Sequence, residues 1–559
     1  MLTKLPNELI ANILALVGKE SSLDLKPLTL VGRQWHAVVA PSLLSIISVS
    51  SLGNLAELCD FLHSKSNSSE EGLPLAVFKN TKTIVISGKI WPAHRDCHVG
   101  LEDLGEVGEG ENEDTDDPAE PDVSLSFDEI SSKLRAGLPL LAALDGLEWY
   151  GRFAGDYHLV RYLQKANIIR HLAYGIDMQV SGVSLGSIRQ AFRFDGLKTL
   201  KITSEYEPEG EIFPFITDMM HRNHDLEEIL FDCKFAETMS GQWSLDDVIC
   251  KDQQVFVWPN LRSLVLRFFK GAFWQSAEQV NQLADFLVAH PLLETLVLRE
   301  TCLEDSESET ALPLSLAAHP SSLPALKLLH GSARLIAGVL ESSAACSSVT
   351  IIVDNSEVGF DADGAKTPYI NRIVEAFQNT PENSARRIEL EVPQLNRDWC
   401  TKLASVVPKV RSVGFLKDLY VGATSISRDP EFNPLDDIPA FLNAFPNLEI
   451  VGQDIAKDFC KALEQEDGET ALIELAKRVP HLNAVYCDEG TFLVVSRDSV
   501  ESLSISKEPV YFDNSGYTWN TFEVDWRHRP LSRRKIYETR RSYNHDFESL
   551  VMRFSASAS

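Results

Sequence analysis

The chain has 559 residues, of which 44% are apolar and 24% are charged, so most of it has the composition of a folded globular protein. Its 52 basic side chains against 81 acidic ones give a net charge of −29, which argues against broad binding to nucleic-acid phosphates and to anionic membranes. No apolar run approaches the ~20 residues that cross a bilayer, and the N-terminal segment lacks the charged-then-apolar order of a signal peptide. Nine cysteines without a C-x-x-C pair favour a reducing compartment, so we expect a cytoplasmic or nuclear protein.

Patterning divides the chain into four zones. Residues 1–50 have the apolar spacing of short helices, and residues 75–508 carry recurring short strand patterns. An acidic insert at residues 102–122 has eleven acids and no Lys or Arg, which predicts a solvated, disordered loop; a role as an acidic binding segment stays open. Residues 509–559 are rich in aromatic and basic side chains, and in so acidic a chain we expect them to cap the preceding domain or to contact acidic surface; a nuclear-targeting role stays open.

The first zone opens with a helix pattern. Pro6 and Glu8 suit the first helical turn, and apolar residues follow at helical spacing as far as Gly18, which ends the run. A second apolar group leads into Trp35, and Pro41 ends the last helical pattern. A unit of about 45 residues cannot bury this many apolar side chains in a core of its own. Some of them are therefore expected to face a partner protein.

These residues resemble an F-box, a three-helix module. The matching orders are L-P-x-E-L-x-x-x-I-L, then L-x-L-V-x-R-x-W-H, then P-x-L, all within the first 50 residues. The resemblance implies docking onto a Skp-type adaptor, which joins a cullin scaffold that carries a RING subunit and a ubiquitin-conjugating enzyme. Carried over residue by residue, it implies adaptor contacts by Leu5, Pro6, Leu9, Ile13, Leu28, Val31 and Trp35. Which of them face the adaptor and which pack inside the module stays open.

The second zone repeats the pattern L-x-x-L-x-L, with other apolar residues at some of the Leu places. Five strong copies begin at Leu197, Leu226, Leu261, Leu293 and Leu323, with separations of 29, 35, 32 and 30 residues. The fourth and sixth places lie two residues apart, so they share one face of a short strand, and that face needs burial. Amphipathic helical stretches separate the copies. Weaker copies begin at Leu144, Ile169, Val410, Leu448, Leu482 and Val500, and several copies have a Pro two residues before the first place.

Strands and helices that alternate at about 30 residues per unit predict an α/β fold with a parallel sheet and helices on its other side. The pattern resembles a leucine-rich repeat, which implies an irregular solenoid with strands on an inner curve and helices outside. The chain departs from that family because no Asn consistently follows the last Leu and the spacing of the weaker copies is irregular. An ordinary α/β domain with a parallel sheet stays open.

The inner face of the repeats is the candidate target-binding surface. The third, fifth and seventh places of each copy alternate away from the buried face. The basic candidates among them are Lys201, Arg267, Arg299 and Lys327. Arg267 and Arg299 occupy the same place in consecutive copies, and paired guanidinium groups suit a carboxylate or a phosphate. A solvated or salt-bridged pair is the alternative.

Few motifs indicate chemistry. Ser184 stands at the centre of a G-x-S-x-G sequence, but no HGGG-type segment lies upstream, so a serine hydrolase is a distant alternative. His94, Cys97 and His98 lack a second pair of ligands, so no metal site is expected, and no Gly-rich phosphate loop is present. We therefore expect neither an enzyme nor a bound cofactor.

The resemblances together indicate the substrate-recognition subunit of a Skp–cullin–F-box ubiquitin ligase, with the F-box on the adaptor and the repeats on an unidentified target protein. The runner-up is a leucine-rich-repeat interaction scaffold that uses its adaptor contact outside ubiquitin ligation. Neither reading requires nucleic acid or a membrane as a partner.

Overall fold

The computed structural model describes about half of the chain. The described residues are 46–49, 80–87, 135–152, 157–177, 189–204, 212–233, 245–270, 277–301, 323–342, 350–354, 370–378, 387–391, 394–395, 397–416, 427–428, 433–463, 468–487, 491–497 and 503–509, with a few single positions besides. The predicted F-box helices, the acidic insert and the basic C-terminal zone lie outside them. The described elements fall into two compact units, one with strands β1 to β5 and one with strands β6 to β20.

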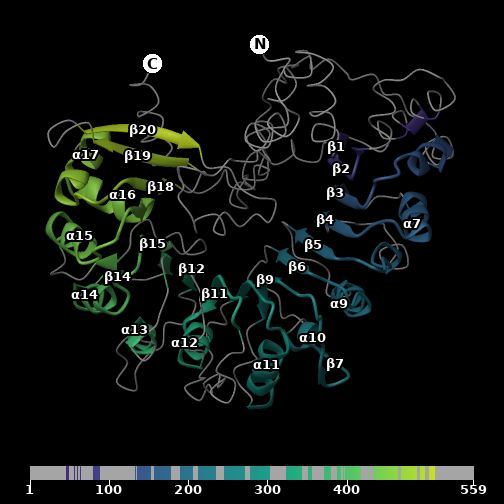
Figure 1. Cartoon of the computed structure of the whole chain (residues 1–559), viewed down its shortest axis with the longest axis horizontal. Helices are drawn as coiled ribbons and strands as arrows, with labels where there is room; N and C mark the ends of the chain where they lie inside the picture. The colour runs from purple at the N-terminus through teal and green to yellow at the C-terminus, as the bar shows by residue number, and fades with distance from the viewer. Residues whose placement is uncertain are drawn as a thin grey trace, which may run out of the picture. The chain divides into compact units, whose positions relative to one another are not determined.

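The first unit is a parallel sheet with helices on one face. Its strands pair in chain order, and they are β1 (Ile46–Val49), β2 (Thr83–Ser87), β3 (Gly146–Arg152), β4 (His171–Asp177) and β5 (Thr199–Ser204). Its helices are η4 (Leu138–Leu140), α7 (Tyr157–Ala166) and α9 (Phe213–Arg222). Figure 1 shows α7 and α9 along the same side of these strands. Strand β1 begins before residue 50, so the sheet already includes the last residues of the range predicted for the F-box.

The second unit continues the same alternation and ends in an antiparallel meander. Its parallel strands are β6 (Glu228–Cys233), β9 (Ser263–Lys270), β10 (Thr295–Thr301), β11 (Leu328–Ser332), β12 (Thr350–Asp354), β13 (Arg387–Glu391), β15 (Ser412–Leu416), β17 (Ile450–Gly452) and β18 (Ala484–Cys487). Strands β19 (Thr491–Arg497) and β20 (Leu503–Pro509) follow antiparallel. Two small pairs stand apart, β7 (Cys250–Lys251) with β8 (Gln254–Val255), and β14 (Gln394–Leu395) with β16 (Ser427–Arg428).

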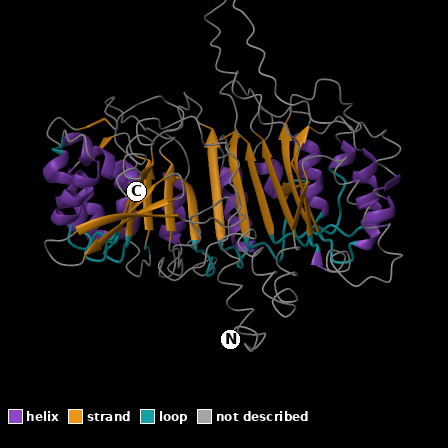
Figure 2. Cartoon of the chain, turned by 90° about the horizontal axis from the view of Figure 1, so that it is seen from above, coloured by secondary structure: helices purple, strands orange, loops and turns teal. Residues whose placement is uncertain are grey.

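Helices lie between the strands of the second unit along the chain. They are α10 (Leu245–Ile249), α11 (Ala277–Ala289), α12 (Ala333–Ser342), α13 (Ile370–Gln378), α14 (Arg397–Val406), α15 (Pro434–Asn443), α16 (Gln453–Ala462) and α17 (Gly468–Arg478). Figure 2 shows neighbouring strands side by side, with helices that flank them. The prediction of an α/β fold with a large parallel sheet and covering helices is confirmed.

A short turn ahead of many strands explains the recurring Pro. In the stretch Trp258-Pro-Asn-Leu261, the backbone N–H of Leu261 donates to the carbonyl of Trp258 at 3.1 Å. The same bond joins Leu448 to Phe445, and Leu482 to Val479, at 3.3 and 3.0 Å. Pro occupies the second position of each of these turns, where its fixed φ favours the bend. The residue before the Pro is buried, so each turn is fastened to the core before the strand begins.

The core between sheet and helices follows the apolar places of the repeat. At the fourth place the register aligns one aliphatic residue per strand, and each of these is at most 2% exposed: Ile84, Leu147, Leu172 and Leu200 in the first unit, then Ile229, Leu264, Leu296, Leu329, Ile351, Ile388, Val413, Val451 and Val485 in the second. Helix α11 supplies Leu283, Phe286 and Leu287 from one of its faces, all at most 1% exposed. Burial of a Leu or Phe side chain contributes about 1.5–3 kcal/mol. The repeated apolar face is therefore the main source of stability.

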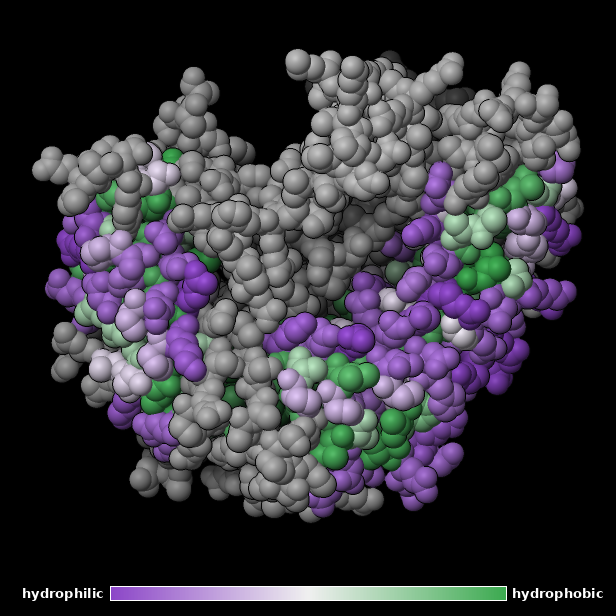
Figure 3. All heavy atoms as spheres, viewed as in Figure 1, coloured by the Kyte–Doolittle hydropathy of each residue, from purple (hydrophilic) through white to green (hydrophobic). Residues whose placement is uncertain are grey.

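In Figure 3, hydrophilic residues cover most of the described surface on the face shown, with smaller apolar patches between them. No helix in the described part of the chain is long and apolar enough to cross a membrane.

Candidate functional site

The sheet face opposite the helices carries the residues predicted to bind a target. The register of the second unit pairs Glu228 with Ser263, and Ser263 with Thr295. These are the third places of consecutive copies, so the predicted alignment is confirmed for β6, β9 and β10. In the first unit His171 pairs with Thr199, the third place of the copy on β5.

The prediction for the fifth strong copy is wrong by three residues. Leu296 of β10 pairs with Leu329 of β11, so the pattern on this strand begins at Leu326 and not at Leu323. Lys327 therefore lies before the strand and not at its fifth place. Its ammonium forms an ion pair with the Glu294 carboxylate at 2.7 Å.

The centre of the face is apolar and enclosed. Leu230, Val265 and Val297 occupy fifth places on β6, β9 and β10, and with Leu328 they form a cluster whose members are at most 6% exposed. Both faces of these strands are therefore buried, which is typical of parallel sheets. The expectation that these fifth places belong to an open binding surface is wrong.

The first unit presents a polar face instead. His171 is exposed, and its Nδ1 lies 3.0 Å from the Thr199 hydroxyl. Lys201, a predicted contact, is half-buried on β5, and the register places Ala173 between it and Glu148. Lys201 is thus less buried than Leu230, Val265 and Val297, the fifth places of the second unit.

Arg267 and Arg299 are brought side by side, as predicted from their repeat positions. They are register partners on β9 and β10, and Asp232 of β6 pairs with Arg267 on its other side. The pairing of β9 with β10 shifts by one residue directly after Arg299, so that Glu300 pairs with Phe269. One acidic and two basic residues therefore form a row across the carboxyl halves of three parallel strands.

A second charged row lies at the opposite ends of the strands and alternates in sign. The Glu294 carboxylate accepts from Arg262 at 2.8 Å and from Lys327 at 2.7 Å, and Arg411 pairs with Glu449 at 2.7 Å. The hydrogen bond from Lys327, with help from Arg262, holds the pKa of Glu294 below its usual value. These residues occupy the second place of the pattern. Their alternating sign is visible in the sequence, but the Leu pattern alone does not indicate it.

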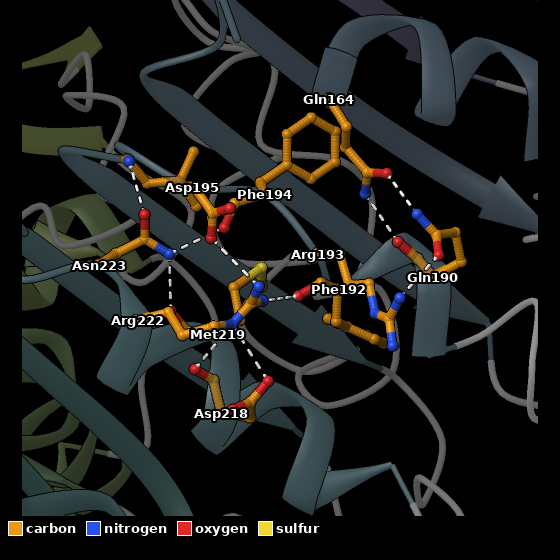
Figure 4. Close-up of polar contacts among 11 residues, drawn as sticks. Gln164, Gln190, Phe192, Arg193, Phe194, Asp195, Asp218, Met219, Arg222 and Asn223 are labelled. Carbon is orange, nitrogen blue, oxygen red and sulfur yellow. Dashed lines mark hydrogen bonds and ion pairs between the residues drawn. The ribbon is translucent and has the colours of Figure 1, made fainter.

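Polar side chains also join consecutive repeats in the first unit (Figure 4). Asn223, 1% exposed, accepts from the Leu197 N–H at 2.8 Å and donates to the carbonyls of Phe194 and Met219 at 3.0 and 2.7 Å. Beside it, Arg222 donates to the carbonyl of Phe192 at 2.7 Å. These contacts satisfy backbone groups at a strand entry, so this cluster holds the fold together.

Arg222 and two glutamines extend the network. The Arg222 guanidinium forms ion pairs with Asp195 and Asp218, both at 3.1 Å. The Gln164 amide donates to the backbone carbonyl of Gln190 at 2.7 Å, and the Gln190 amide donates to the Gln164 side-chain oxygen at 2.8 Å. Sequence reasoning missed these residues because polar residues near helix ends are common.

His290 has the equivalent role in the second unit. Its Nε2 accepts from the backbone N–H of Trp258 at 3.0 Å, and its Nδ1 lies 2.6 Å from the Phe286 carbonyl. An acceptor at Nε2 and a donor at Nδ1 define a neutral ring. Burial lowers the pKa of His290, although the bond to Phe286 opposes this. The histidine is therefore a structural link between repeats.

Other chemical candidates find little support among the described residues. Burial raises the pKa of the Cys59 and Cys460 thiols to about 12, which makes them poor nucleophiles. The described residues contain no group of three or more His, Cys, Asp or Glu side chains able to hold a metal ion. Ser184 lies outside the described residues.

The predicted adaptor contacts also lie outside the described residues, and they stay predictions: Leu5, Pro6, Leu9, Ile13, Leu28, Val31 and Trp35. Comparison with models of known protein families finds no match, and a search of curated proteins finds none either.

Proposed function

We propose that this chain is the substrate-recognition subunit of a Skp–cullin–F-box ubiquitin ligase. The observation that carries the proposal is the joining, in one chain, of an F-box-like segment to a long series of stacked strand–helix repeats. The F-box-like segment is suited to a fixed adaptor, and the repeats are suited to a variable target.

We infer that the repeats form an irregular leucine-rich-repeat solenoid. Three features support this: the parallel register, the single aliphatic row at the fourth place and the recurring Pro turn. Repeat stacks of this kind bury a continuous core between neighbouring units and leave extended surfaces for binding. The polar strand face of the first unit and the Arg267–Arg299 pair are the parts that suit contact with a target.

The proposed mechanism is proximity. A target held by the repeats has a high effective concentration near the ubiquitin-conjugating enzyme carried by the cullin. The chain itself makes or breaks no bond in this scheme. Its place of action is the cytoplasm or the nucleus.

Co-expression with a Skp-type adaptor tests the docking step. We expect a stable pair that the double substitution Leu9→Glu and Trp35→Glu abolishes, because two charges enter an apolar contact. Asn12→Glu with Lys19→Glu is the matched control, since it changes charge at polar positions of the same segment. Retained binding by the first variant would overturn the adaptor assignment.

Further measurements separate the alternatives. Adaptor binding without cullin recruitment or target turnover would favour the scaffold. Labelling of Ser184 by a fluorophosphonate probe would favour the hydrolase.

A further inference from the structure

The strand-entry end of the second unit exposes apolar side chains at two neighbouring turns. Among the described residues, the large apolar side chains that face solvent are Val257, 44% exposed, and Leu292, 42% exposed. Val257 directly precedes the turn ahead of β9, and Leu292 lies within the turn ahead of β10. The Trp258 N–H donates to the His290 ring at 3.0 Å, so the two turns are in direct contact. Two consecutive repeats thus each carry an exposed apolar side chain at the same end.

Four charged side chains border these turns. They occupy the second place of consecutive repeats, in the order Glu227, Arg262, Glu294 and Lys327, and each N–H after the first donates to the carbonyl of the residue before it, at 2.8, 2.7 and 2.7 Å. The side chains of Arg262 and Lys327 are 57% and 50% exposed, and that of Glu294 is 30% exposed. Glu227 is half-buried. One buried residue separates Leu292 from Glu294, so the charged and apolar groups leave the core at the same end.

This row of four charges complements itself. Its signs alternate, beginning with an acid at Glu227 and ending with a base at Lys327. A second copy turned about a twofold axis presents the same row in the opposite direction. Glu227 then faces Lys327 of the second copy, and Arg262 faces Glu294 of the second copy, so every facing pair has opposite signs. The axis passes between the repeats of β9 and β10, which are the two repeats that carry the exposed apolar side chains.

The pattern also selects this axis over its neighbours. An axis that passed through β9 or through β10 would place like charges opposite each other, which costs free energy of association. Apolar contact at the centre with charges around it is the usual anatomy of an interface. Because exposed ion pairs add little affinity, Val257 and Leu292 supply the attraction and the charges fix the alignment.

We infer that two copies of this chain associate through the strand-entry end of β9 and β10, about a twofold axis between these two repeats. The inference goes beyond the proposed function and does not depend on it. In the proposed ligase, such a pair holds two targets, or two sites of one target, at the same time.

Sedimentation of the full chain over a series of concentrations tests the association. We expect a monomer–dimer equilibrium that Leu292→Asp weakens about tenfold or more, because a charge enters the apolar part of the contact. Lys409→Asp is the matched control, since it places the same side chain at the same exposed position of the turn ahead of β15. It should dimerise as the unchanged chain does.

Two charge reversals test the twofold alignment. Two copies with Arg262→Glu bring only carboxylates together at the axis, and two copies with Glu294→Arg bring only guanidinium groups together there. Each variant by itself should therefore dimerise about tenfold less tightly or worse. One copy of each variant restores opposite signs in every facing pair, so a mixture should form a mixed dimer. With an affinity tag on one variant, recovery of the untagged variant measures it.

A chain that stays monomeric up to its solubility limit would overturn the inference. A dimer that Leu292→Asp and both charge reversals leave unchanged would overturn it as well. Both reversals change partly exposed side chains, and circular dichroism checks that each variant is folded. If both are folded and the mixture forms no mixed dimer, the twofold alignment is wrong. The proposed function stands in each case, because adaptor docking does not use this surface.

Discussion

Asn223 and His290 occupy the same place in two repeats, directly after helices α9 and α11. Each is buried, and each satisfies a backbone group at the turn or strand entry of the preceding repeat. An amide and an imidazole are both able to donate and accept at once, which is what this place demands. Polar residues here fasten neighbouring repeats to one another and were not recognised as important from the sequence.

Replacing Asn223 by Ala should be costly. Three hydrogen bonds are lost, and the Leu197 N–H stays buried without its acceptor, so we expect a loss of about 2 kcal/mol or more. Urea unfolding of the full chain measures it. Lys165→Ala, an exposed change on α7, is the control and should shift the free energy by less than about 0.5 kcal/mol. An Asn223→Ala midpoint equal to that of the unchanged protein would contradict the assignment.

His290 should make stability depend on pH. Its pKa is lowered in the folded state, so near and below the ordinary value of about 6.5 the unfolded chain binds more protons than the folded one. The contribution of the neutral ring is therefore fully present above that pH and declines as the pH falls. His290→Gln, which keeps a donor and an acceptor without a titrating ring, should flatten this decline in urea unfolding between pH 8 and pH 5.

The exposed His224 provides the control for that experiment. In a chain that carries His224→Gln, the substitution His290→Gln should still flatten the pH dependence of the unfolding free energy. An identical pH dependence for His290→Gln and the unchanged protein would show that the buried ring does not titrate as its contacts require.

At the scale of the elements, β11 shows where a pattern misleads. The stretch from Leu323 to Leu329 has Leu at four places. A match to the L-x-x-L-x-L pattern by leucines alone therefore selects Leu323, Leu326 and Leu328. The paired strand begins its pattern at Leu326, and Gly331 takes the sixth place. A Cβ at Gly331 would lie 2.7 Å from the Leu298 carbonyl oxygen and 2.7 Å from Leu335 Cδ2. Leu335, in the first turn of α12, thus occupies space that a leucine at the sixth place would need.

The alternating charges at the strand entries should stabilise the contact between neighbouring repeats. Glu294→Lys places a cation between Arg262 and Lys327, whereas Glu294→Gln only removes the ion pairs. Because these groups are partly exposed, we expect Gln to cost less than about 1 kcal/mol and Lys to cost more. Salt should narrow the gap between the two variants by screening the repulsion, as urea midpoints at low and high salt would show. A gap that does not respond to salt would contradict an electrostatic origin.

At the scale of the molecule, hydrogen exchange should differ among the strands of the second unit. Strands β9 and β10 have strand neighbours on both sides and buried residues on both faces, including Val265 and Val297. Strand β20 is the last strand in the sheet order. Since local opening is rarest where backbone bonds and side chains are both enclosed, we expect the slowest exchange in β9 and β10 and the fastest in β20. Mass spectrometry of the full chain checks this order, and equal protection would argue against it.

The sequence by itself determined the class of fold, the apolar face of each strand and the places of several helices. These follow from the spacing of Leu, Ile and Val, which acts within a few residues. The weaker copies at Leu144, Ile169, Leu448 and Leu482 coincide with β3, β4, β17 and β18. Strands β2, β12 and β13 were missed because their apolar runs are short and lack the full Leu pattern.

Only the tertiary structure decided the register of β11, the enclosure of Leu230, Val265 and Val297, and the partners of Glu294 and Asn223. Each depends on what a neighbouring repeat presents across the sheet or at its turn. Local periodicity predicts which side of a strand a residue occupies. It does not predict whether that side is buried or which strand pairs with the one that carries the residue. That is why Arg267 and Arg299 could be paired from their spacing, whereas Lys327 was placed on the wrong element.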